Sequence, residues 1–449
     1  MDKFLLEKYD RPAPRYTSYP TAPYWQDNGM SAESWRSHLI EAYRQSADIS
    51  LYIHLPYCEK LCTYCGCNKR ITTNHGVEQP YISSILQEWQ LYLQALPGKP
   101  RLREIHLGGG TPTFFSPANL RQLLEPILAS ADVPPDFEGS FEAHPASTSH
   151  EHLQALYDLG FRRVSVGVQD FDPFIMSVIN RSQTEEQVAQ VTAWARAIGY
   201  ASVNFDLIFG LPFQTPDHIR ANVAKVKAMR PDRIAFYSYA HVPWIKPSQR
   251  AYSEADLPLG ADKRALYELG CDLLLETGYH EIGMDHFALP HDTLAQAHAA
   301  GRLHRNFMGY TAAHTYLSIG LGASAIGDTW TAFAQNEKQV EAYQARVARG
   351  EFPLIRGYAL SAEDRILRRH ILNLMCQQHT HWRNEDSRCP ELYAGLSRLA
   401  ELEADGLVVR GDRALTITEA GRPFLRNICL AFDAHYWAAQ PQTPVFSRL

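Results

Sequence analysis

The sequence lacks any apolar run long enough to cross a membrane, and it lacks a strong charge of either sign. No stretch approaches the roughly eighteen apolar residues that predict a transmembrane helix. The N-terminal stretch MDKFLLEKYDRPAPRY contains no continuous apolar core of a signal peptide. The 43 basic and 49 acidic residues leave a net charge of −6, which indicates neither nucleic acid nor an anionic membrane as the main partner. These absences predict a cytoplasmic protein without a membrane span.

Cysteine is scarce outside one short segment. The chain has eight cysteines, and four of them lie close together at Cys58, Cys62, Cys65 and Cys67. Because disulfides are rare in the cytoplasm, this group indicates a metal site and not a disulfide framework. The other four, which we expect to be reduced thiols, are Cys271, Cys376, Cys389 and Cys429.

The order of apolar patterns predicts an α/β protein. The 449 residues allow two or three domains with large cores. Residues 1–48 form a Pro- and Tyr-rich lead-in that ends in one amphipathic helix at 32–45. Short strands are then predicted at 49–55, 103–107, 139–143, 162–168, 202–208 and 233–239. Helices are predicted between them at 79–95, 117–129, 149–159, 184–198 and 216–229. Such alternation predicts a parallel sheet, here a partial (βα)6 TIM-like barrel.

The pattern changes from residue 361 onward. Helices are predicted at 362–375, 390–403 and 422–438. The stretch DGLVVRGDRALTITEAG predicts two short strands joined by a Gly-Asp turn. Helices with such a hairpin are typical of a winged-helix-like domain over 361–449. Without a basic recognition helix it does not indicate DNA binding, and we expect a lid or packing role.

Unusual polar residues follow the predicted strands at their C-terminal ends. The clustered cysteines follow the first strand, and GGGTPT (108–113) follows the second. Glu142, Gln169 and Asp206 lie at the third, fourth and fifth strands, and YAH (239–241) follows the sixth. Barrel active sites lie at the C-terminal ends of strands. The sequence therefore predicts one site at one barrel mouth, with the cysteines at its rim.

The spacing C-x3-C-x2-C-x-C leaves zinc and iron–sulfur ligation as alternatives. Zinc commonly takes four cysteines in two separated pairs, whereas iron–sulfur clusters use closely spaced runs. All four cysteines lie on one predicted loop, which favours the iron–sulfur cluster. The first three, with Tyr64 just before the last of them, resemble the motif of radical S-adenosylmethionine (radical-SAM) enzymes.

This resemblance implies a cofactor set and a mechanism. Cys58, Cys62 and Cys65 would hold a [4Fe–4S] cluster whose fourth iron is open to S-adenosyl-L-methionine. One electron from an unidentified low-potential donor would then cleave that molecule into methionine and a 5′-deoxyadenosyl radical, which abstracts hydrogen from the substrate. The glycines at 108–110 let the backbone approach a ligand closely, and the resemblance makes that ligand the methionine amino group.

Motifs along essentially the whole chain resemble the oxygen-independent coproporphyrinogen III oxidases of this superfamily. They are PRYTSYPTA (14–22), YIHLPYCEKLCTYCGCNK (52–69), GGGTPT (108–113), VSVGVQDF (164–171), INRSQ (179–183), DLIFGLPFQT (206–215), YAHVP (239–243), IGMDHFA (282–288) and HRNFMGYT (304–311). The resemblance implies a radical-SAM barrel with an extension over 49–330. It implies oxidative decarboxylation of two propionates of coproporphyrinogen III to vinyl groups, giving protoporphyrinogen IX in haem biosynthesis. It also implies two bound S-adenosylmethionine molecules, and we expect a monomer.

Carried over by position, the resemblance assigns residues to each S-adenosylmethionine. Those expected at the first are Tyr52, Gly109, Glu142 and Ile326. Those expected at the second are Tyr64, Gly110, Thr111, Gln169, Arg181, Asp206 and Ala240. The acids suit ribose hydroxyls or an ammonium, and an arginine suits a carboxylate. A single strand-end acid or arginine is more often a structural ion pair, but their shared position favours a site.

His54 and Cys67 are our candidate catalytic residues. His54 lies in an apolar strand, where a histidine is more often a satisfied core residue. Cys67 is not needed by a three-cysteine cluster, so it is either a small buried thiol or a group that delivers a proton or hydrogen or contacts the second S-adenosylmethionine. Two positions depart from the family pattern: His144 replaces an aspartate in E-x-D-P, and Met308 replaces a glutamine in NFQGYTTQ.

Three alternatives remain on sequence grounds. A haem chaperone of the same superfamily would lack the PRYTSYPT lead-in and the cysteine at position 67, and both are present. A radical-SAM methyltransferase or haem-degrading enzyme would share the scaffold, and a zinc-stabilised module would not need the ordered strand-end residues. A tetracarboxylate substrate requires a local basic patch, for which Arg15 and Arg305 are candidates. The lead-in is either a lid across the barrel mouth or a strap along its side.

Overall fold

The computed structural model describes residues 3–9 and 11–439. The ends of the predicted lead-in (1–48) and of the predicted C-terminal unit (361–449) therefore include positions outside the described residues, namely 1–2, 10 and 440–449. Within the described part of the chain, no helix combines the length and the apolar character needed to span a membrane.

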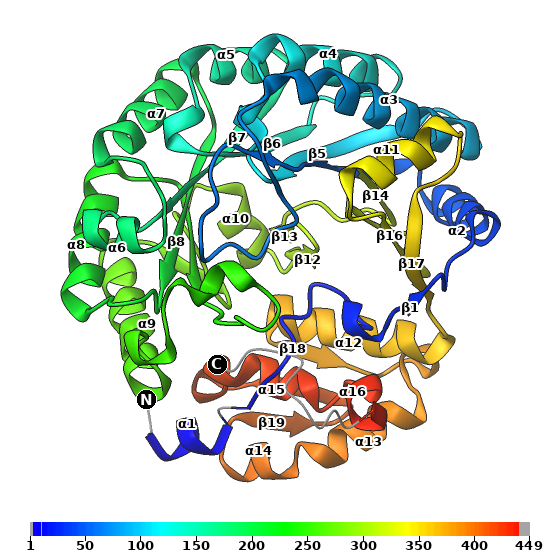
Figure 1. Cartoon of the computed structure of the whole chain (residues 1–449). Coiled ribbons are helices and arrows are strands. Elements are labelled where there is room, and N and C mark those ends of the chain that lie inside the picture. The colour runs from blue at the N-terminus through cyan, green and yellow to red at the C-terminus, as the bar shows by residue number, and fades with distance from the viewer. Residues whose placement is uncertain (1–2, 10, 440–449) are drawn as a thin grey trace.

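Six parallel strands form the centre of a thirteen-stranded sheet. In chain order they are β2 (Asp48–Leu55), β5 (Arg101–Gly109), β6 (Glu138–Ala143), β7 (Phe161–Gln169), β8 (Ser202–Phe209) and β9 (Arg233–Ser238). Each pairs in parallel with the next. The connecting helices form the outer arc in Figure 1 and are α3 (Glu78–Ala95), α4 (Pro117–Ala129), α5 (His150–Asp158), α7 (Glu185–Ile198) and α8 (Pro216–Met229). The partial (βα)6 barrel is confirmed, with every predicted strand and helix within two residues of its observed bounds.

Local sequence explains these elements. On β2, Ile49, Leu51, Ile53 and Leu55 are fully buried, as expected for a parallel strand enclosed by helices. The Ser116 side chain caps α4 by accepting a hydrogen bond from the backbone of the third helical residue, and proline follows at the first helical position.

The sheet extends beyond the six predicted strands on both sides. Next to β2 it adds β14 (Leu317–Leu321), β15 (Ile326–Asp328), β16 (Ala332–Asn336), β17 (Leu354–Ala359) and β1 (Gln26–Asp27). Next to β9 it adds β11 (His286–Ala288) and β10 (His280–Gly283), which follow α9 (Gly260–Glu276). The sequence analysis did not predict these strands, because segments of two to six residues carry too few alternations to be recognised.

The C-terminal unit has the element order of a winged helix. Its helices α12 (Ala362–Gln377), α13 (Pro390–Arg398) and α14 (Ala400–Ala404) accompany an antiparallel sheet of β18 (His379–His381), β19 (Val408–Gly411) and β20 (Ala414–Ile417). The predicted hairpin is confirmed. The single helices predicted at 390–403 and 422–438 were wrong, because the first divides at Leu399 and the second becomes α15 (Leu425–Leu430) and α16 (Ala434–Ala439).

A buried carboxylate explains the second break. Asp433 accepts hydrogen bonds from the Tyr16 hydroxyl at 3.1 Å and from the Tyr436 backbone N–H at 3.0 Å. Its side chain therefore caps the start of α16. Aspartate is favoured at such a capping position and disfavoured inside a helix.

The segment of the lead-in between α1 (Lys3–Tyr9) and β1 runs between the barrel and the C-terminal unit (Figure 1). Helix α1 is tied to this unit by an ion pair between Lys8 and Asp405 at 2.6 Å. Tyr16 and Tyr19 are each only 1% exposed, within a cluster of C-terminal side chains. The first part of the lead-in therefore packs with the C-terminal unit, whereas its helix α2 (Ala32–Gln45) packs on the barrel core through Trp35 and Leu39.

Candidate active site

One cavity, of about 470 Å³, opens at the C-terminal ends of the parallel strands. Twelve predicted site residues line it: Cys58, Cys62, Tyr64, Cys65, Cys67, Gly109, Gly110, Thr111, Glu142, Gln169, Arg181 and Asp206. They come from the ends of β5, β6, β7 and β8 and from the loops after β2 and β7. Residues far apart in the sequence therefore meet at one barrel mouth.

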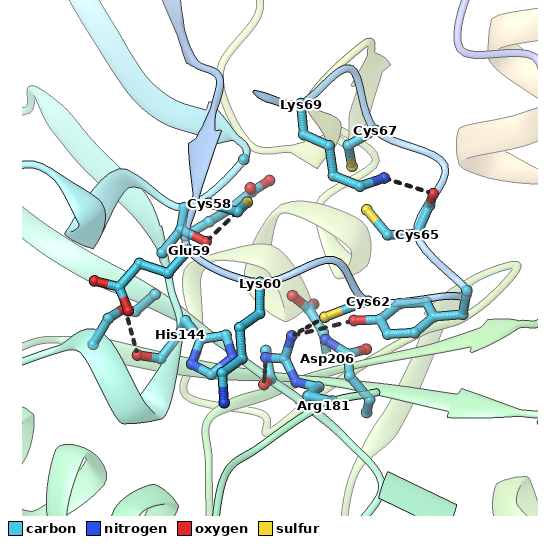
Figure 2. Close-up of a pocket in the computed structure, with 18 of the residues that line it drawn as sticks. Cys58, Glu59, Lys60, Cys62, Cys65, Cys67, Lys69, His144, Arg181 and Asp206 are labelled. Carbon is cyan, nitrogen blue, oxygen red and sulfur yellow. Dashed lines mark hydrogen bonds between the residues drawn. The ribbon is translucent and has the colours of Figure 1, made fainter. Parts of the chain in front are cut away.

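The cysteine loop folds over this cavity (Figure 2). The Thr111 hydroxyl and the Cys58 thiol form a hydrogen bond of 3.3 Å, and Arg181 Nη1 approaches Cys62 Sγ at 3.6 Å. Hydrogen bonding from the Cys67 thiol, followed by the charge of Lys69, lowers the pKa of Cys65 to about 6. A lowered pKa favours the thiolate form, which is the form that binds metal.

The cysteines fit an iron–sulfur cluster. All eight cysteines of the chain are free of disulfides. No three histidine, cysteine or carboxylate side chains of residues 3–9 and 11–439 are arranged around a single metal ion. A [4Fe–4S] cluster makes a different demand, because each cysteine binds a different iron, and closely spaced thiolates are its usual ligands.

The glycine turn after β5 packs directly on the loop after β2. A Cβ on Gly110 would lie 2.6 Å from the carbonyl of Pro56, and one on Gly109 would lie 2.7 Å from the His54 ring. Gly109 also has φ of +116°, which side chains rarely adopt. Its N–H donates to Glu142 Oε2 at 3.1 Å, so the turn also positions this carboxylate.

His54 lies behind the wall of the cavity. Its Nε2 donates to the Asn68 carbonyl at 2.8 Å, so Nδ1 is the acceptor for the Tyr52 hydroxyl at 3.0 Å. Burial lowers the pKa of His54, which keeps the imidazole neutral. With both nitrogens occupied, His54 holds the cysteine loop against the glycine turn, and its Tyr52 partner is half-buried beside it.

Ala240 and Ile326 also lie outside the lining. The Gln249 amide donates to the carbonyls of Ala240 and Tyr64, at 3.1 and 3.2 Å, and so connects these two predicted residues. Ile326 packs with a small apolar cluster around Trp25. Gln249 was missed by the sequence analysis, because an isolated glutamine in a loop carries no pattern.

Arg181, which is buried, and Asp206, which is half-buried, are polar residues that line the cavity. Arg181 donates from Nη1 to the Tyr64 hydroxyl at 3.4 Å and from Nη2 to the Gly167 carbonyl. Asp206 accepts from Ser165 at 2.9 Å and from Asn204 at 2.8 Å. Burial, followed by the charge of Glu142, raises the pKa of Asp206 to about 6.

The lining residues that were not assigned to the site from the sequence include Lys60, Lys69, His144 and Tyr237. The two lysines lie inside the cysteine motif, which was the signal that could have found them. Tyr237 lies at the end of the sixth strand, so the strand-end pattern could have found it. His144 follows the third strand, and the sequence marked it only as a departure from the family. Met308, the other departure, lies in the turn between β12 (His304–Asn306) and β13 (Gly309–Thr311), outside the lining.

The two predicted basic residues meet beside Tyr237. The Arg15 guanidinium lies 5.6 Å from the centre of the Tyr237 ring and forms an ion pair with Asp285. Arg305 is only 4% exposed, stacks on Tyr310 at 4.5 Å and donates to the Arg15 carbonyl at 3.3 Å. Its Nε and Nη1 have no hydrogen-bond partner in the described part of the chain. This arrangement leaves an excess of positive charge next to a wall of the cavity.

Comparisons with known proteins agree with this geometry. Residues 52–226 match the radical SAM superfamily. The chain is 37% identical to the oxygen-independent coproporphyrinogen III oxidase of Pseudomonas aeruginosa and 36% identical to that of Escherichia coli, over 100% of this chain and 98% of each relative. The solved structure of the Escherichia coli coproporphyrinogen III oxidase, described as a radical SAM enzyme, matches with a TM-score of 0.90 at 35% identity, over 96% of this chain and 98% of that one. Full-length similarity at this level, together with the cysteine-lined barrel mouth, shows that the chain belongs to the family of oxygen-independent coproporphyrinogen III oxidases.

Proposed function

We propose that the chain converts coproporphyrinogen III to protoporphyrinogen IX without oxygen, by oxidative decarboxylation of two propionates to vinyl groups in haem biosynthesis. One observation carries the proposal. The cysteine loop, the glycine turn and the polar residues Glu142, Arg181 and Asp206 line a single cavity, in a chain similar over its full length to such oxidases.

Cys58, Cys62 and Cys65 are our proposed cluster ligands. When bound, the [4Fe–4S] cluster and S-adenosylmethionine supply the one-electron chemistry that starts hydrogen removal from the substrate. Cys67 lines the same cavity and hydrogen-bonds the Cys65 thiol, which supports a catalytic or contact role for it. His54 acts by holding the loop in place.

The remaining residues are proposed to bind two S-adenosylmethionine molecules. Glu142 and the Gly109 turn suit the first, while Arg181 and Asp206 suit the second. The lining position of all four supports this assignment. Tyr52 and Ile326 lie outside the cavity lining, so they would support the first molecule indirectly, by positioning lining residues. Ala240 would support the second molecule through its hydrogen bond with Gln249.

The three segments of the chain take different roles in this proposal. Residues 49–330 carry the chemistry, residues 361–449 support the lead-in, and residues 1–48 cover the barrel mouth, where Arg15 and Arg305 attract propionates. Covering the mouth would exclude water, and charge interactions are stronger in a site without water. We further propose a cytoplasmic monomer that receives electrons from a low-potential donor and binds no nucleic acid.

Product analysis tests this function. After anaerobic reconstitution with iron and sulfide, the protein should convert coproporphyrinogen III to protoporphyrinogen IX when S-adenosylmethionine and a strong reductant are present. Chromatography of the oxidised porphyrins measures the yield. Stoichiometric haem binding without any decarboxylated product would indicate a haem chaperone.

Arg181→Ala and Asp206→Ala should each weaken S-adenosylmethionine binding while leaving the cluster intact. Losing a hydrogen bond to a charged group costs about 1.5–3 kcal/mol, which corresponds to roughly 10- to 150-fold in affinity. Equilibrium dialysis measures affinity and stoichiometry, and iron analysis checks the cluster. Arg121→Ala, which removes an exposed ion pair with Asp158 on the outer helices, is the control and should change neither. Unchanged binding in both active-site variants would contradict the assignment.

The raised pKa of Asp206 predicts a pH dependence of binding. Because burial raises this pKa to about 6, the carboxylate is ionised above that pH and gains a proton below it. A ligand hydroxyl or ammonium held by the ionised carboxylate should therefore bind less tightly as the pH falls through about 6. Titrations of S-adenosylmethionine at about pH 8 and about pH 5.5 measure this loss. Asp206→Asn should bind weakly at both values, and an unaltered pH dependence in this variant would assign the effect to another group.

A further inference from the structure

His144 lies on a rigid turn at the end of β6 and faces the cavity. The backbone N–H of Ala146 donates to His144 Nδ1 at 3.1 Å, so the ring proton is on Nε2. The His144 carbonyl accepts from the Ser147 backbone at 3.0 Å and from the Thr148 hydroxyl at 2.8 Å. The turn therefore holds the imidazole in place and presents Nε2–H as a hydrogen-bond donor at the cavity wall.

Lys60 lies beside this imidazole over the same cavity (Figure 2). Its ammonium donates to the Ser182 hydroxyl at 2.9 Å, and among residues 3–9 and 11–439 no carboxylate forms an ion pair with it. The neighbouring Glu59 is paired with His75 instead, at 3.4 Å. The lysine charge at this point of the cavity is thus uncompensated.

Burial, followed by the charges of Arg181 and Lys60, lowers the pKa of His144 to about 3. The ring is therefore neutral over the working pH range and contributes a donor without contributing a charge. A lysine ammonium without an ion-pair partner among the described residues and a fixed N–H match the needs of one carboxylate.

We propose that Lys60 and His144 form a subsite for an aliphatic carboxylate. Two molecules of the proposed function carry such a group, namely S-adenosylmethionine in its methionine part and the porphyrinogen in its propionates. The inference therefore rests on the proposed function and adds to it two residues that hold and orient a ligand. An aspartate at position 144, as in the family pattern, would neutralise Lys60 and repel a carboxylate, so the histidine creates the subsite.

A matched pair of substitutions tests the charge without disturbing the turn. In both His144→Asp and His144→Asn the new side chain accepts a hydrogen bond from Ala146 as the histidine does, because both residues favour such turns. Only the aspartate adds a negative charge opposite Lys60. Lys60→Met removes the ammonium, and Lys60→Arg retains a cation. All four variants should have the same iron content and the same melting temperature as the unsubstituted protein.

The readouts are the half-saturating concentration of S-adenosylmethionine and the KM for coproporphyrinogen III. His144→Asp and Lys60→Met should raise one of these about tenfold or more, the effect of losing a hydrogen-bonded charge. Lys60→Arg should remain within about threefold of the unsubstituted protein, and His144→Asn, which loses the ring N–H but adds no charge, should show a smaller rise than His144→Asp. A rise for S-adenosylmethionine alone assigns the subsite to its methionine carboxylate, and a rise for the porphyrinogen alone assigns it to a propionate.

Two results would overturn the subsite. One is a change of less than about twofold in both quantities for His144→Asp and Lys60→Met. The other is a defect in His144→Asn as large as in His144→Asp, which would show that the ring shape matters and the charge does not. Failure of the unsubstituted protein to form product would instead reject the proposed function, and the S-adenosylmethionine titrations would still test the subsite.

Discussion

Alanine at Cys58, Cys62 or Cys65 is expected to abolish bound iron and all oxidase activity, whereas Cys67→Ser is expected to retain the iron. Each of the three would supply the only protein ligand to one iron, so no neighbouring group compensates for its loss. Serine at position 67 keeps a hydroxyl that donates to the Cys65 sulfur, the contact that lowers the pKa of Cys65. Loss of activity with retained iron in Cys67→Ser would then separate catalysis from cluster binding.

Iron, sulfide and zinc analysis after anaerobic reconstitution provides the measurement. Cys271→Ala is the control, because this half-buried thiol lies on α9, away from the cysteine loop, and should change nothing. Loss of iron in Cys67→Ser would favour a four-cysteine site. Stoichiometric zinc in place of iron would restore the zinc-stabilised module as the better interpretation.

The fold and most of the cavity could be predicted because both depend on a repeating local pattern. In a parallel barrel all strands end at the same mouth, so Glu142, Gln169 and Asp206 had to meet once their strands were recognised. The same reasoning places Tyr237, which ends the sixth strand. Position in the pattern predicted which mouth a residue reaches.

The depth of a residue in the site was not predictable in this way. His54 belongs to the first cysteine motif, yet its ring is turned behind Gly109, because the hydroxyl of Tyr52 and the carbonyl of Asn68 occupy its nitrogens. Which face of a strand end points into a cavity depends on how the neighbouring loop folds back. That fold-back involves partners many residues away and leaves no periodic signal.

Long-range pairing also explains the helix that was predicted wrongly near the C-terminus. The pattern over 422–438 is helical by itself, but Asp433 is buried against Tyr16 of the lead-in, 417 residues earlier. A buried carboxylate needs hydrogen-bond donors, and it obtains one of them from the backbone at the start of α16. The tertiary contact therefore overrides the local helical preference.

The lead-in should be required for product formation and not for the cluster. A chain that begins at residue 31 lacks Arg15 beside Tyr237 and also lacks Tyr16 and Tyr19. It should still bind iron and cleave S-adenosylmethionine under strong reductant, because the hydrogen bonds found for the cysteine loop come from other parts of the chain, such as Arg181, Thr111 and Gln249. It should form no protoporphyrinogen IX if the lead-in covers the substrate.

Because the truncation also uncovers the C-terminal core, a point substitution must accompany it. Arg15→Gln leaves both tyrosines in place and removes only the charge, so it should raise the KM for coproporphyrinogen III about tenfold, the expected loss for a charged hydrogen bond, while S-adenosylmethionine cleavage stays normal. Arg15→Lys, which keeps a cation near Asp285, should recover part of this loss. Full oxidase activity in the truncated chain would reject the lid. Loss of the cluster in the truncated chain, with normal kinetics in Arg15→Gln, would show instead that the segment is a strap whose packing holds the two units of the protein together.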